Sequence, residues 1–412
     1  MEPNEQTTKN INFFVKLKKF SSYCILSSLT KYFLFTQVQK IKRRQIHKLI
    51  LELQREIIPQ TKIKSFTLPG IIRSIAFSPC EKYLLVACDN SNKAFIYNID
   101  MENRQLVDEV FLELTGHTNR IKSVAYSPAG DIVATGGRGI DAIFSSNFRN
   151  GILFNNSYID NTVIIHCVNN SDKENYGKQL LILQCHTGWV RTLTFSPCGK
   201  YLASGSHDRT VKIHCLDKTN INSYGKVIKS FSDHTDFVIS ISYNLNGKLL
   251  ATGSGVDNSV LIYNSNYKDS EDFGKILLKI DRFSDGVINI KFSPVDDSLV
   301  ILLENNIKIF EIFEIVNNKE LNYNEILNTK GHSSYISDVC FSPNGNYILS
   351  GGCDNYIIMH GPIYEVQNRE VNTSIILEND SVKSIRSLSY SSSGNFFALG
   401  GDEKKLNLYT CK

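Results

Sequence analysis

The chain lacks the features that mark several classes of protein. Proline is scarce, at nine of 412 residues, which excludes collagen-like and proline-rich chains. No Cys-x-x-Cys pair occurs among the ten cysteines, so the sequence predicts no bound metal and no redox motif. No apolar run is long enough to cross a membrane, because Lys31 interrupts the stretch 20–35.

Motifs of catalysis are missing as well. The sequence has no Gly-x-Ser-x-Gly, no His-Glu-x-x-His, no P-loop and no Rossmann phosphate loop. Its glycine clusters at 136–139 and 253–255 lie between expected strands, where they indicate turns. We therefore expect no enzymatic activity and no cofactor.

The overall composition is that of a globular protein. Hydrophobic residues make up 42% of the chain and charged residues 21%, which excludes bulk disorder. The cysteines are scattered and no signal peptide precedes them, so we expect reduced, mostly buried thiols. A cytoplasmic or nuclear location follows as the expectation.

Acidic residues are absent between Glu5 and Glu52, which sets the N-terminal part apart. Residues 1–60 contain eleven Lys and Arg against four Asp and Glu, whereas 61–412 contain 34 against 37. The net charge of the whole chain is only +4, which argues against a protein that coats nucleic acid along its length. We expect a basic extension over 1–60 and one large domain over 61–412.

The extension is predicted to contain one amphipathic helix, over 37–58. Apolar residues recur there at helical spacing and Pro59 ends the pattern. These apolar residues are Ile46, Leu49, Ile50, Leu53 and Ile57. Such a helix suits docking on a partner, on the domain itself or on an anionic membrane surface, and a targeting segment is the second interpretation.

An internal repeat dominates residues 61–412. An aromatic residue followed by Ser-Pro, or by a remnant of that dipeptide, recurs at Phe77, Tyr126, Phe195, Tyr243, Phe292, Phe341 and Tyr390. Five of the six gaps are 48 or 49 residues and the other is 69. Each unit contains short runs in which apolar and polar residues alternate, bounded by turn residues, which is typical of strands. The pattern predicts an all-β domain of seven repeats.

The repeats resemble those of the WD40 family, whose members form β-propellers with four-stranded blades. The resemblance rests on residues at the family's His, Ser/Thr and Asp positions in four units: His117, Thr135, Asp160, His186, Ser204, Asp208, His234, Thr252, Asp257, His332, Ser350 and Asp354. It implies a buried hydrogen-bonded network in these blades. The family's Trp-Asp dipeptide is absent, and its tryptophan position holds Tyr97, His166, His214, Tyr263, Phe310, His360 and Tyr409.

The resemblance also implies seven blades and a defined way of closing the ring. In the family, the outer strand of the last blade comes from the N-terminal side, and 63–68 is the segment that this sequence offers. The recurring histidines lie one to a repeat, so we interpret them as structural residues and not as metal ligands. In the fifth unit, where the network residues are nearly all replaced, we expect no network.

The one long gap places an insertion of about 20 residues, at about 138–157, in the second unit. It falls between the second and third strands expected there. Its apolar residues, Ile143, Phe144, Phe148, Ile152 and Phe154, suit recognition of a partner. A loop without a role, or a segment that the cellular protein lacks, are the alternatives.

Recognition is the function that we expect, at the positions that begin the innermost strands. In the family these positions lie near the mouth of the central channel and often contact partners. Here they place aromatic residues beside cations: Trp189, Phe237, Tyr335, Arg73, Arg120, Lys122, Arg191 and Arg386. Such a surface favours a protein or peptide partner with acidic or phosphorylated residues, whereas packing between blades is the alternative role for Trp189 and Phe237.

The sequence thus predicts a non-enzymatic scaffold that binds protein partners on the channel faces of a seven-bladed propeller. One alternative is a substrate-recognition or assembly subunit of a larger complex, such as a ubiquitin ligase, an RNA-processing particle or a trafficking coat. The other alternative is an RNA-binding propeller that uses the cations named above and the basic extension.

Overall fold

The computed structural model describes residues 59–102, 105–139, 160–268, 271–281, 283–315, 320–363, 373–378 and 384–411. The chain divides into a unit over Met1–Glu56 and a unit over Ile57–Lys412, and all described residues belong to the second. The helix predicted over 37–58 lies outside them, as does the predicted insertion from residue 140 onward. The described residues form strands and turns and no α-helix.

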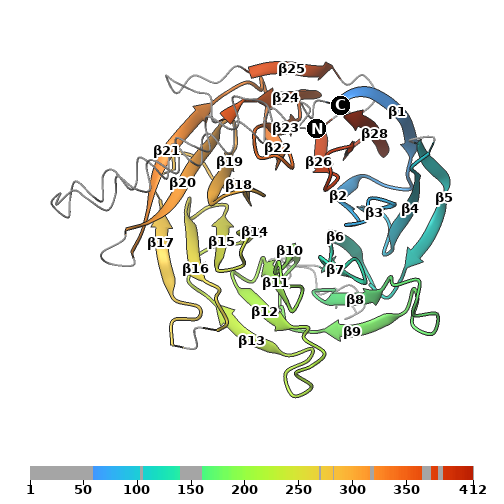
Figure 1. Ribbon diagram of the computed structural model, residues 1–412, viewed down its shortest axis with the longest axis horizontal. Coiled ribbons are helices and arrows are strands. Elements are labelled where there is room, and N and C mark those ends of the chain that lie inside the picture. The colour runs from blue at the N-terminus through green and yellow to red at the C-terminus, as the bar shows by residue number, and fades with distance from the viewer. Residues whose placement is uncertain are drawn as a thin grey trace, which may run out of the picture. The chain divides into compact units, whose positions relative to one another are not determined.

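Twenty-eight strands form seven four-stranded antiparallel sheets, the blades of a propeller (Figure 1). From the channel outwards, blade 1 contains β2 (Ile72–Phe77), β3 (Tyr83–Cys88), β4 (Ala94–Asp100) and β5 (Gln105–Leu114); blade 2 contains β6 (Arg120–Tyr126), β7 (Ile132–Arg138), β8 (Val163–Cys167) and β9 (Gln179–Leu183); blade 3 contains β10 (Val190–Phe195), β11 (Tyr201–Ser206), β12 (Val211–Cys215) and β13 (Val227–Phe231); blade 4 contains β14 (Val238–Tyr243), β15 (Leu249–Ser254), β16 (Val260–Asn264) and β17 (Ile276–Ile280).

The remaining three blades repeat the arrangement. Blade 5 contains β18 (Val287–Phe292), β19 (Ser298–Leu303), β20 (Ile307–Ile315) and β21 (Glu320–Thr329); blade 6 contains β22 (Ile336–Phe341), β23 (Ile348–Gly352), β24 (Tyr356–His360) and β25 (Thr373–Glu378); blade 7 contains β26 (Ile385–Tyr390), β27 (Phe396–Gly401), β28 (Lys405–Cys411) and β1 (Pro59–Thr67). The seven-bladed all-β prediction is therefore confirmed.

The core lies between neighbouring blades, because the alternating strands bury apolar side chains on both faces of each sheet. One cluster joins Ile165 of blade 2 to Leu193 and Leu202 of blade 3, and comparable clusters lie at the other blade junctions. The second strand of a blade is buried almost throughout, which explains its small residues, such as Ala203 and Ser204. Each blade is stabilised by its neighbours, as in other repeat architectures.

The ring closes through the N-terminal strand. β1 pairs antiparallel with β28, and the inner strand β2 packs against β26 (Figure 1). On the opposite side of the same junction, Glu81 has a left-handed φ of 62° where blades 2, 3, 4, 6 and 7 have glycine. Its carboxylate accepts hydrogen bonds from the Ser392 hydroxyl, at 2.9 Å, and from the backbone and hydroxyl of Ser393. β1 therefore completes blade 7, and blades 1 and 7 are joined by the packing of β2 against β26 and by the contacts of Glu81.

Every inner strand carries a β-bulge at the same place. The pairing register with the second strand shifts at one residue in all seven blades. That residue is the fourth before the repeat aromatic: Arg73, Lys122, Arg191, Ile239, Ile288, Ser337 and Arg386, which we call the bulge ring. A bulge changes the direction of the side chain of its extra residue. The identities of the bulge-ring residues therefore determine which chemical groups lie at the channel mouth.

A ladder of polar side chains links the inner strands. Ser74 accepts a hydrogen bond from the Val124 backbone at 3.2 Å, and Asp338 accepts one from Leu388 at 2.7 Å. Ser240 and Ser387 do the same for the backbones of the blades that follow them. These bonds cross from one blade to the next and hold the bulged strands in register around the channel.

Candidate functional site: the mouth of the channel

The mouth is the end of the channel at which the inner strands begin. Of the predicted binding residues there, Trp189 and Phe237 are half-buried, Arg120 is exposed and Tyr335 is 36% exposed. The other four, Arg73, Lys122, Arg191 and Arg386, belong to the bulge ring. Each bulge-ring residue has a counterpart 16 positions later, at the end of the second strand of the same blade, and the two lie together in blades 1, 4, 6 and 7.

In blades 1 and 7 this facing pair is an ion pair. Arg73 donates to Asp89 at 2.6 Å through Nε, and Arg386 donates to Asp402 at 2.9 and 2.7 Å. Burial alone raises the pKa of Asp402, but the hydrogen bonds from Arg386 outweigh it and leave that pKa below its usual value. Two of the predicted binding cations are therefore already neutralised within their own blades.

In blades 2 and 3 the acidic member of the pair is missing. Arg138 is the counterpart of Lys122 and lies close enough to lower its pKa, and His207 is the counterpart of Arg191. Among the described residues, no hydrogen bond or ion pair reaches the Lys122 ammonium or the Arg191 guanidinium. Burial, together with Arg191, Arg73 and Arg138, lowers the pKa of Lys122 well below its usual value. This side of the mouth thus carries an excess of positive charge.

Four side chains stack across this side of the mouth. The Arg138 guanidinium lies 4.2 Å from the centre of the Trp189 ring, Trp189 stacks on His207 at 4.6 Å, and His207 stacks on Phe237 at 4.3 Å. The stack joins blades 2, 3 and 4. Trp189 and Phe237 therefore pack between blades, as the alternative interpretation had it, and also line the mouth. The Trp189 indole N–H is buried without a hydrogen-bond partner in the described part of the chain.

The far side of the mouth has aliphatic side chains at its bulge positions, and the counterpart position of blade 5 holds the exposed Glu304. Blade 4 contributes Ile239, and blade 5 contributes Ile288, at the bulge positions. Gly255 faces Ile239, and a Cβ at Gly255 would lie only 2.5 Å from the Ile239 Cδ1 atom. The isoleucine thus covers the site that a charged partner takes in blades 1 and 7. The mouth is polarised, with cations over blades 2 and 3 and aliphatic side chains over blades 4 and 5.

The buried network forms in the four blades for which the resemblance implied it. The histidine Nδ1 atom lies 2.8–3.1 Å from an aspartate oxygen, and its Nε2 atom lies 2.7–2.8 Å from a Ser or Thr hydroxyl. The triplets are His117–Asp160–Thr135, His186–Asp208–Ser204, His234–Asp257–Thr252 and His332–Asp354–Ser350. In blades 3 and 6 a second histidine extends the network, since His214 and His360 lie 2.9 and 2.8 Å from the serine hydroxyl.

At two other tryptophan positions the fourth member has a different arrangement. His166 lies 2.8 Å from the Thr115 carbonyl rather than near Thr135, and Tyr263 donates to Asp233 at 3.0 Å while also contacting the Thr252 hydroxyl. In blade 5, Phe283 replaces the histidine and packs edge-on against Phe310 at 6.3 Å. In blade 5 an apolar pair thus takes the place of the polar network. Replacement of a buried ion pair by well-packed apolar side chains often costs a fold little or no stability.

One group among the described residues has metal-ligand chemistry, Cys185, His186 and His214. Its donors are already engaged. His186 uses both ring nitrogens on Asp208 and Ser204, and the His214 Nε2 atom also faces Ser204. Burial raises the pKa of the Cys185 thiol to about 11, which keeps it protonated near neutral pH. We interpret the group as part of the blade network.

The network histidines make the stability of the fold depend on pH. Burial lowers the pKa of His360 to about 3, against about 6.5 in an unfolded chain. Between these two pKa values, His360 is protonated in the unfolded state and neutral in the native state. The free energy of unfolding therefore falls as the pH drops below about 6.5. His360→Trp keeps an N–H for Ser350 and removes the titrating nitrogen that is buried without a partner.

We expect His360→Trp to raise the free energy of unfolding more at pH 5 than at pH 8, by about 2 kcal/mol. Denaturant titrations at the two pH values measure this difference. Equal effects at both pH values would mean that His360 does not titrate between the native and unfolded states.

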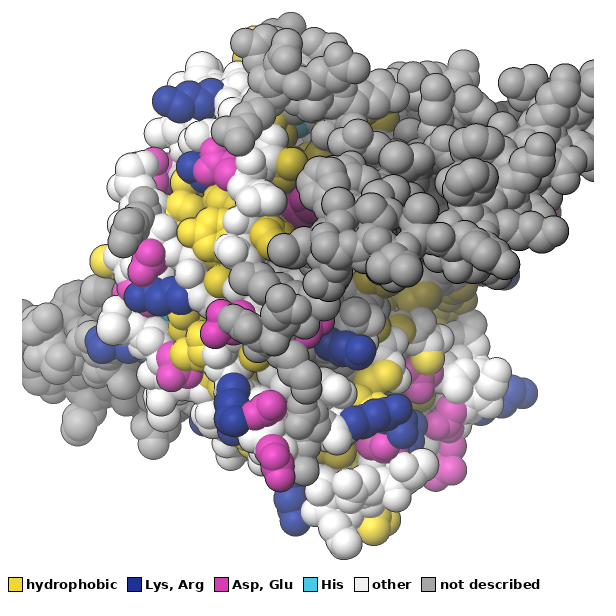
Figure 2. Space-filling model, turned by 60° about the vertical axis from the view of Figure 1, so that its left-hand side comes forward, with side chains coloured by type: hydrophobic (Ala, Val, Ile, Leu, Met, Phe, Trp, Pro, Cys, Tyr) yellow, Lys and Arg dark blue, Asp and Glu magenta, His cyan; other side chains and the backbone are white. Residues whose placement is uncertain are grey.

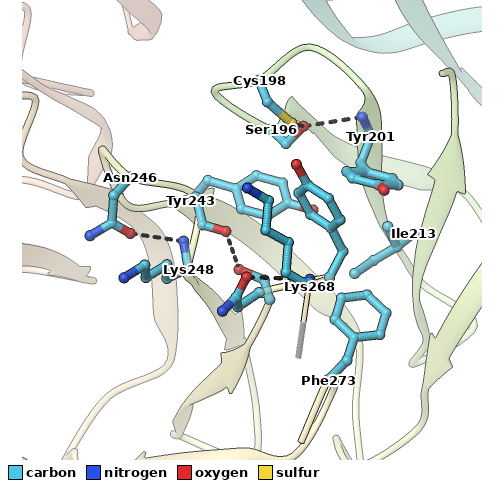
Figure 3. A pocket seen from close by; sticks show the side chains of 13 residues that line it. Ser196, Cys198, Tyr201, Ile213, Tyr243, Asn246, Lys248, Lys268 and Phe273 are labelled. Atoms are coloured by element: carbon cyan, nitrogen blue, oxygen red, sulfur yellow. Dashed lines mark hydrogen bonds between the residues drawn. The ribbon is translucent and has the colours of Figure 1, made fainter. Parts of the chain in front are cut away.

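A cavity of about 180 Å³ opens on the opposite face, between blades 3 and 4 (Figure 3). The rings of Tyr201, Tyr243 and Phe273 line it, with Lys248 and Lys268 at its edge (Figure 3). The equivalent space between blades 1 and 2 is filled by Phe111, which stacks on Tyr83 at 5.2 Å. The cavity is therefore a place where a large side chain is missing from the repeat pattern.

The described residues on the side that Figure 2 presents show no comparable charge separation. On the side that Figure 2 presents, basic and acidic side chains are interspersed around small apolar patches. Nine cysteines lie in the described ranges and all are free thiols, with Cys80 and Cys198 exposed. The search for a membrane-spanning helix found no candidate within the described residues.

Sequence reasoning missed four residues of the mouth, Asp89, Arg138, His207 and Asp402. Arg138 was placed at the start of the insertion, but it is the last residue of β7. All four could have been found by the fixed offset of 16 residues from the bulge ring. The sequence alone gives no reason to compare residues at that offset, because the position of the bulge is known only from the structure.

Five segments of the chain match the model of the WD domain, G-beta repeat: residues 60–98, 109–142, 177–215, 225–264 and 324–360. A comparison with curated proteins found no match. The fold and the mouth define a seven-bladed propeller with a polarised channel entrance. Its repeats place the chain in the WD40-repeat family. WD40 propellers generally serve as non-enzymatic scaffolds for protein interactions.

Proposed function

We propose that this propeller is a non-enzymatic scaffold that binds a protein partner at the mouth of its channel. The polarised mouth carries the proposal: Trp189 and Phe237 belong to the stack that Arg138 covers, and Tyr335 lies close enough to Arg191 for their charges to interact. Tryptophan, tyrosine and arginine dominate the energetics of protein interfaces, and a half-buried stack presents them at low entropic cost. An acidic peptide segment suits this combination, with its charges over blades 2 and 3.

Trp189→Ala and Arg191→Glu are expected to abolish capture of the partner from native cells while leaving the melting temperature within a few degrees of wild type. Both side chains lie at the mouth, outside the core clusters between blades. Quantitative affinity capture and thermal melts of the same preparations measure the two effects. A parallel loss of capture and stability would mean that these residues serve packing alone.

Two narrower roles stay proposals. The chain would be a recognition or assembly subunit of a larger complex if residues 1–60 attach it there, and their deletion would then remove one stable complex. RNA binding would show a steep salt dependence. The ion pairs of Arg73 and Arg386 reduce the free positive charge, which favours a protein over RNA. The free thiols suit a cytoplasmic or nuclear location.

A further inference from the structure

We propose that Lys122, Arg138 and Arg191 bind a phosphate monoester at the mouth, between blades 2 and 3. The inference rests on the proposed function in one respect, since it names the chemical group by which a partner would be held. It concerns only one side of the mouth. The aromatic and aliphatic residues elsewhere on the mouth are not needed for it.

Equivalent positions in blades 1 and 7 show how the fold neutralises a bulge-ring cation. In blades 1 and 7 the bulge-ring arginine is held by an aspartate 16 residues later, at 2.6–2.9 Å. Blade 2 has Arg138 in the aspartate position and blade 3 has His207. In blade 2 a second cation therefore stands where blades 1 and 7 have a neutralising carboxylate. Such an arrangement costs stability unless an external anion occupies the site.

Positive charges outnumber negative charges on this side of the mouth. Four cations, Arg73, Lys122, Arg138 and Arg191, lie close enough to affect one another, and each of the other three lowers the pKa of Lys122. Asp89 is the one carboxylate among the groups that act on Lys122, and it is shared between Arg73 and Arg138, the latter at 3.5 Å. A carboxylate ligand would remove one charge of this excess, whereas a phosphate monoester brings nearly two.

The donors on this side of the mouth are of the kind that binds a phosphate. The guanidinium of Arg191 and the ammonium of Lys122 have no hydrogen-bond partner in the described ranges, and the Trp189 indole N–H is buried without one. Arg138 is positioned by its stacking on Trp189. A phosphate offers three strong acceptor oxygens, and charge-assisted bonds to Arg and Lys are among the strongest in proteins. Ile239 and Ile288 across the mouth would receive apolar residues that flank a phosphorylated side chain.

The single tryptophan of the chain reports directly on this site, because Arg138 lies over its ring. The probes are inorganic phosphate and a short leucine-flanked phosphoserine peptide, titrated at constant ionic strength with chloride as the balancing anion. We expect a saturable change in Trp189 fluorescence for both probes. Tighter binding of the peptide, by tenfold or more, would assign the phosphate to a protein partner, and equal binding would assign it to a small phosphate compound.

Arg138→Asp gives the sharpest variant, because it builds into blade 2 the ion pair that blades 1 and 7 already have. We expect it to weaken phosphate binding at least tenfold and to leave the melting temperature unchanged or higher. Lys122→Met tests the same site should Arg138→Asp fold poorly. The matched control is the double variant Arg386→Gln/Asp402→Asn, which removes an already neutral pair of the same ring and should bind phosphate as wild type does.

No saturable response in the wild type, or equal binding by Arg138→Asp, would overturn the inference. The proposed function would survive such a failure if Trp189→Ala still abolished partner capture. Conversely, phosphate binding with unchanged capture by Trp189→Ala would retain the anion site and reject the scaffold role of the mouth.

Discussion

Asp208→Ala is expected to lower the free energy of unfolding by about 3–5 kcal/mol, the usual cost of removing one partner from a buried ion pair. The Asp208 carboxylate accepts hydrogen bonds from His186, at 2.8 Å, from the Thr187 backbone, and from the backbone and hydroxyl of Thr210. Its loss leaves the buried His186 without its main partner. His186 in turn holds Ser204 and, through it, His214.

Asp217→Ala is the matched control for this experiment. Asp217 accepts the same pair of bonds from the residue two positions later, Thr219, with the same distances of 3.0 and 2.6 Å. It has a lysine partner at the surface in place of a buried histidine. We expect its replacement to change the denaturant midpoint little. Similar losses for both variants would show that the turn, and not the network, carries the stability.

Removal of residues 1–68 is expected to abolish cooperative folding. The deletion takes away β1, the outer strand of blade 7, together with the buried Phe66 and Leu68. It also exposes the edge of β28, and an uncovered edge strand promotes aggregation. Gel filtration and a thermal melt measure the result, which we expect to be soluble aggregate without a sharp transition.

Removal of residues 1–56 alone tests whether closure is the cause. This shorter deletion ends at the division between the two units and keeps every residue of β1. We expect a monodisperse protein with a sharp melting transition. An equally damaged product from the shorter deletion would mean that the propeller depends on the preceding unit and not on the closing strand.

The architecture was predictable from the sequence because a propeller repeats one local pattern. Strand alternation and the 48–49-residue spacing of aromatics such as Phe195 and Tyr243 determine the number of blades without any long-range information. The closing strand was expected at 63–68 and is found as β1, over Pro59–Thr67. The loss of the tryptophan did not alter the fold, since His214 and His360 take its place beside the serine hydroxyl.

The mouth was only partly predictable, and the reason is geometric. The sequence indicated which residues begin the inner strands, but not that one of them is bulged in every blade. Without the bulge, nothing connects Arg73 to Asp89 or Lys122 to Arg138, which lie 16 residues apart. Eight residues were predicted as one binding surface, whereas the structure separates the paired Arg73 and Arg386 from the unpaired Lys122 and Arg191.

The central claim, that partners bind at the mouth, is tested most directly by photo-crosslinking from two matched tyrosines. Tyr335 lies at the mouth and is 36% exposed, and Tyr267 lies at the cavity of the opposite face and is 39% exposed. A photoreactive phenylalanine derivative replaces each tyrosine in turn in the full chain, expressed in its native cells. We predict crosslinks to a discrete partner from position 335 and few from position 267. Crosslinks from position 267 alone would contradict the account.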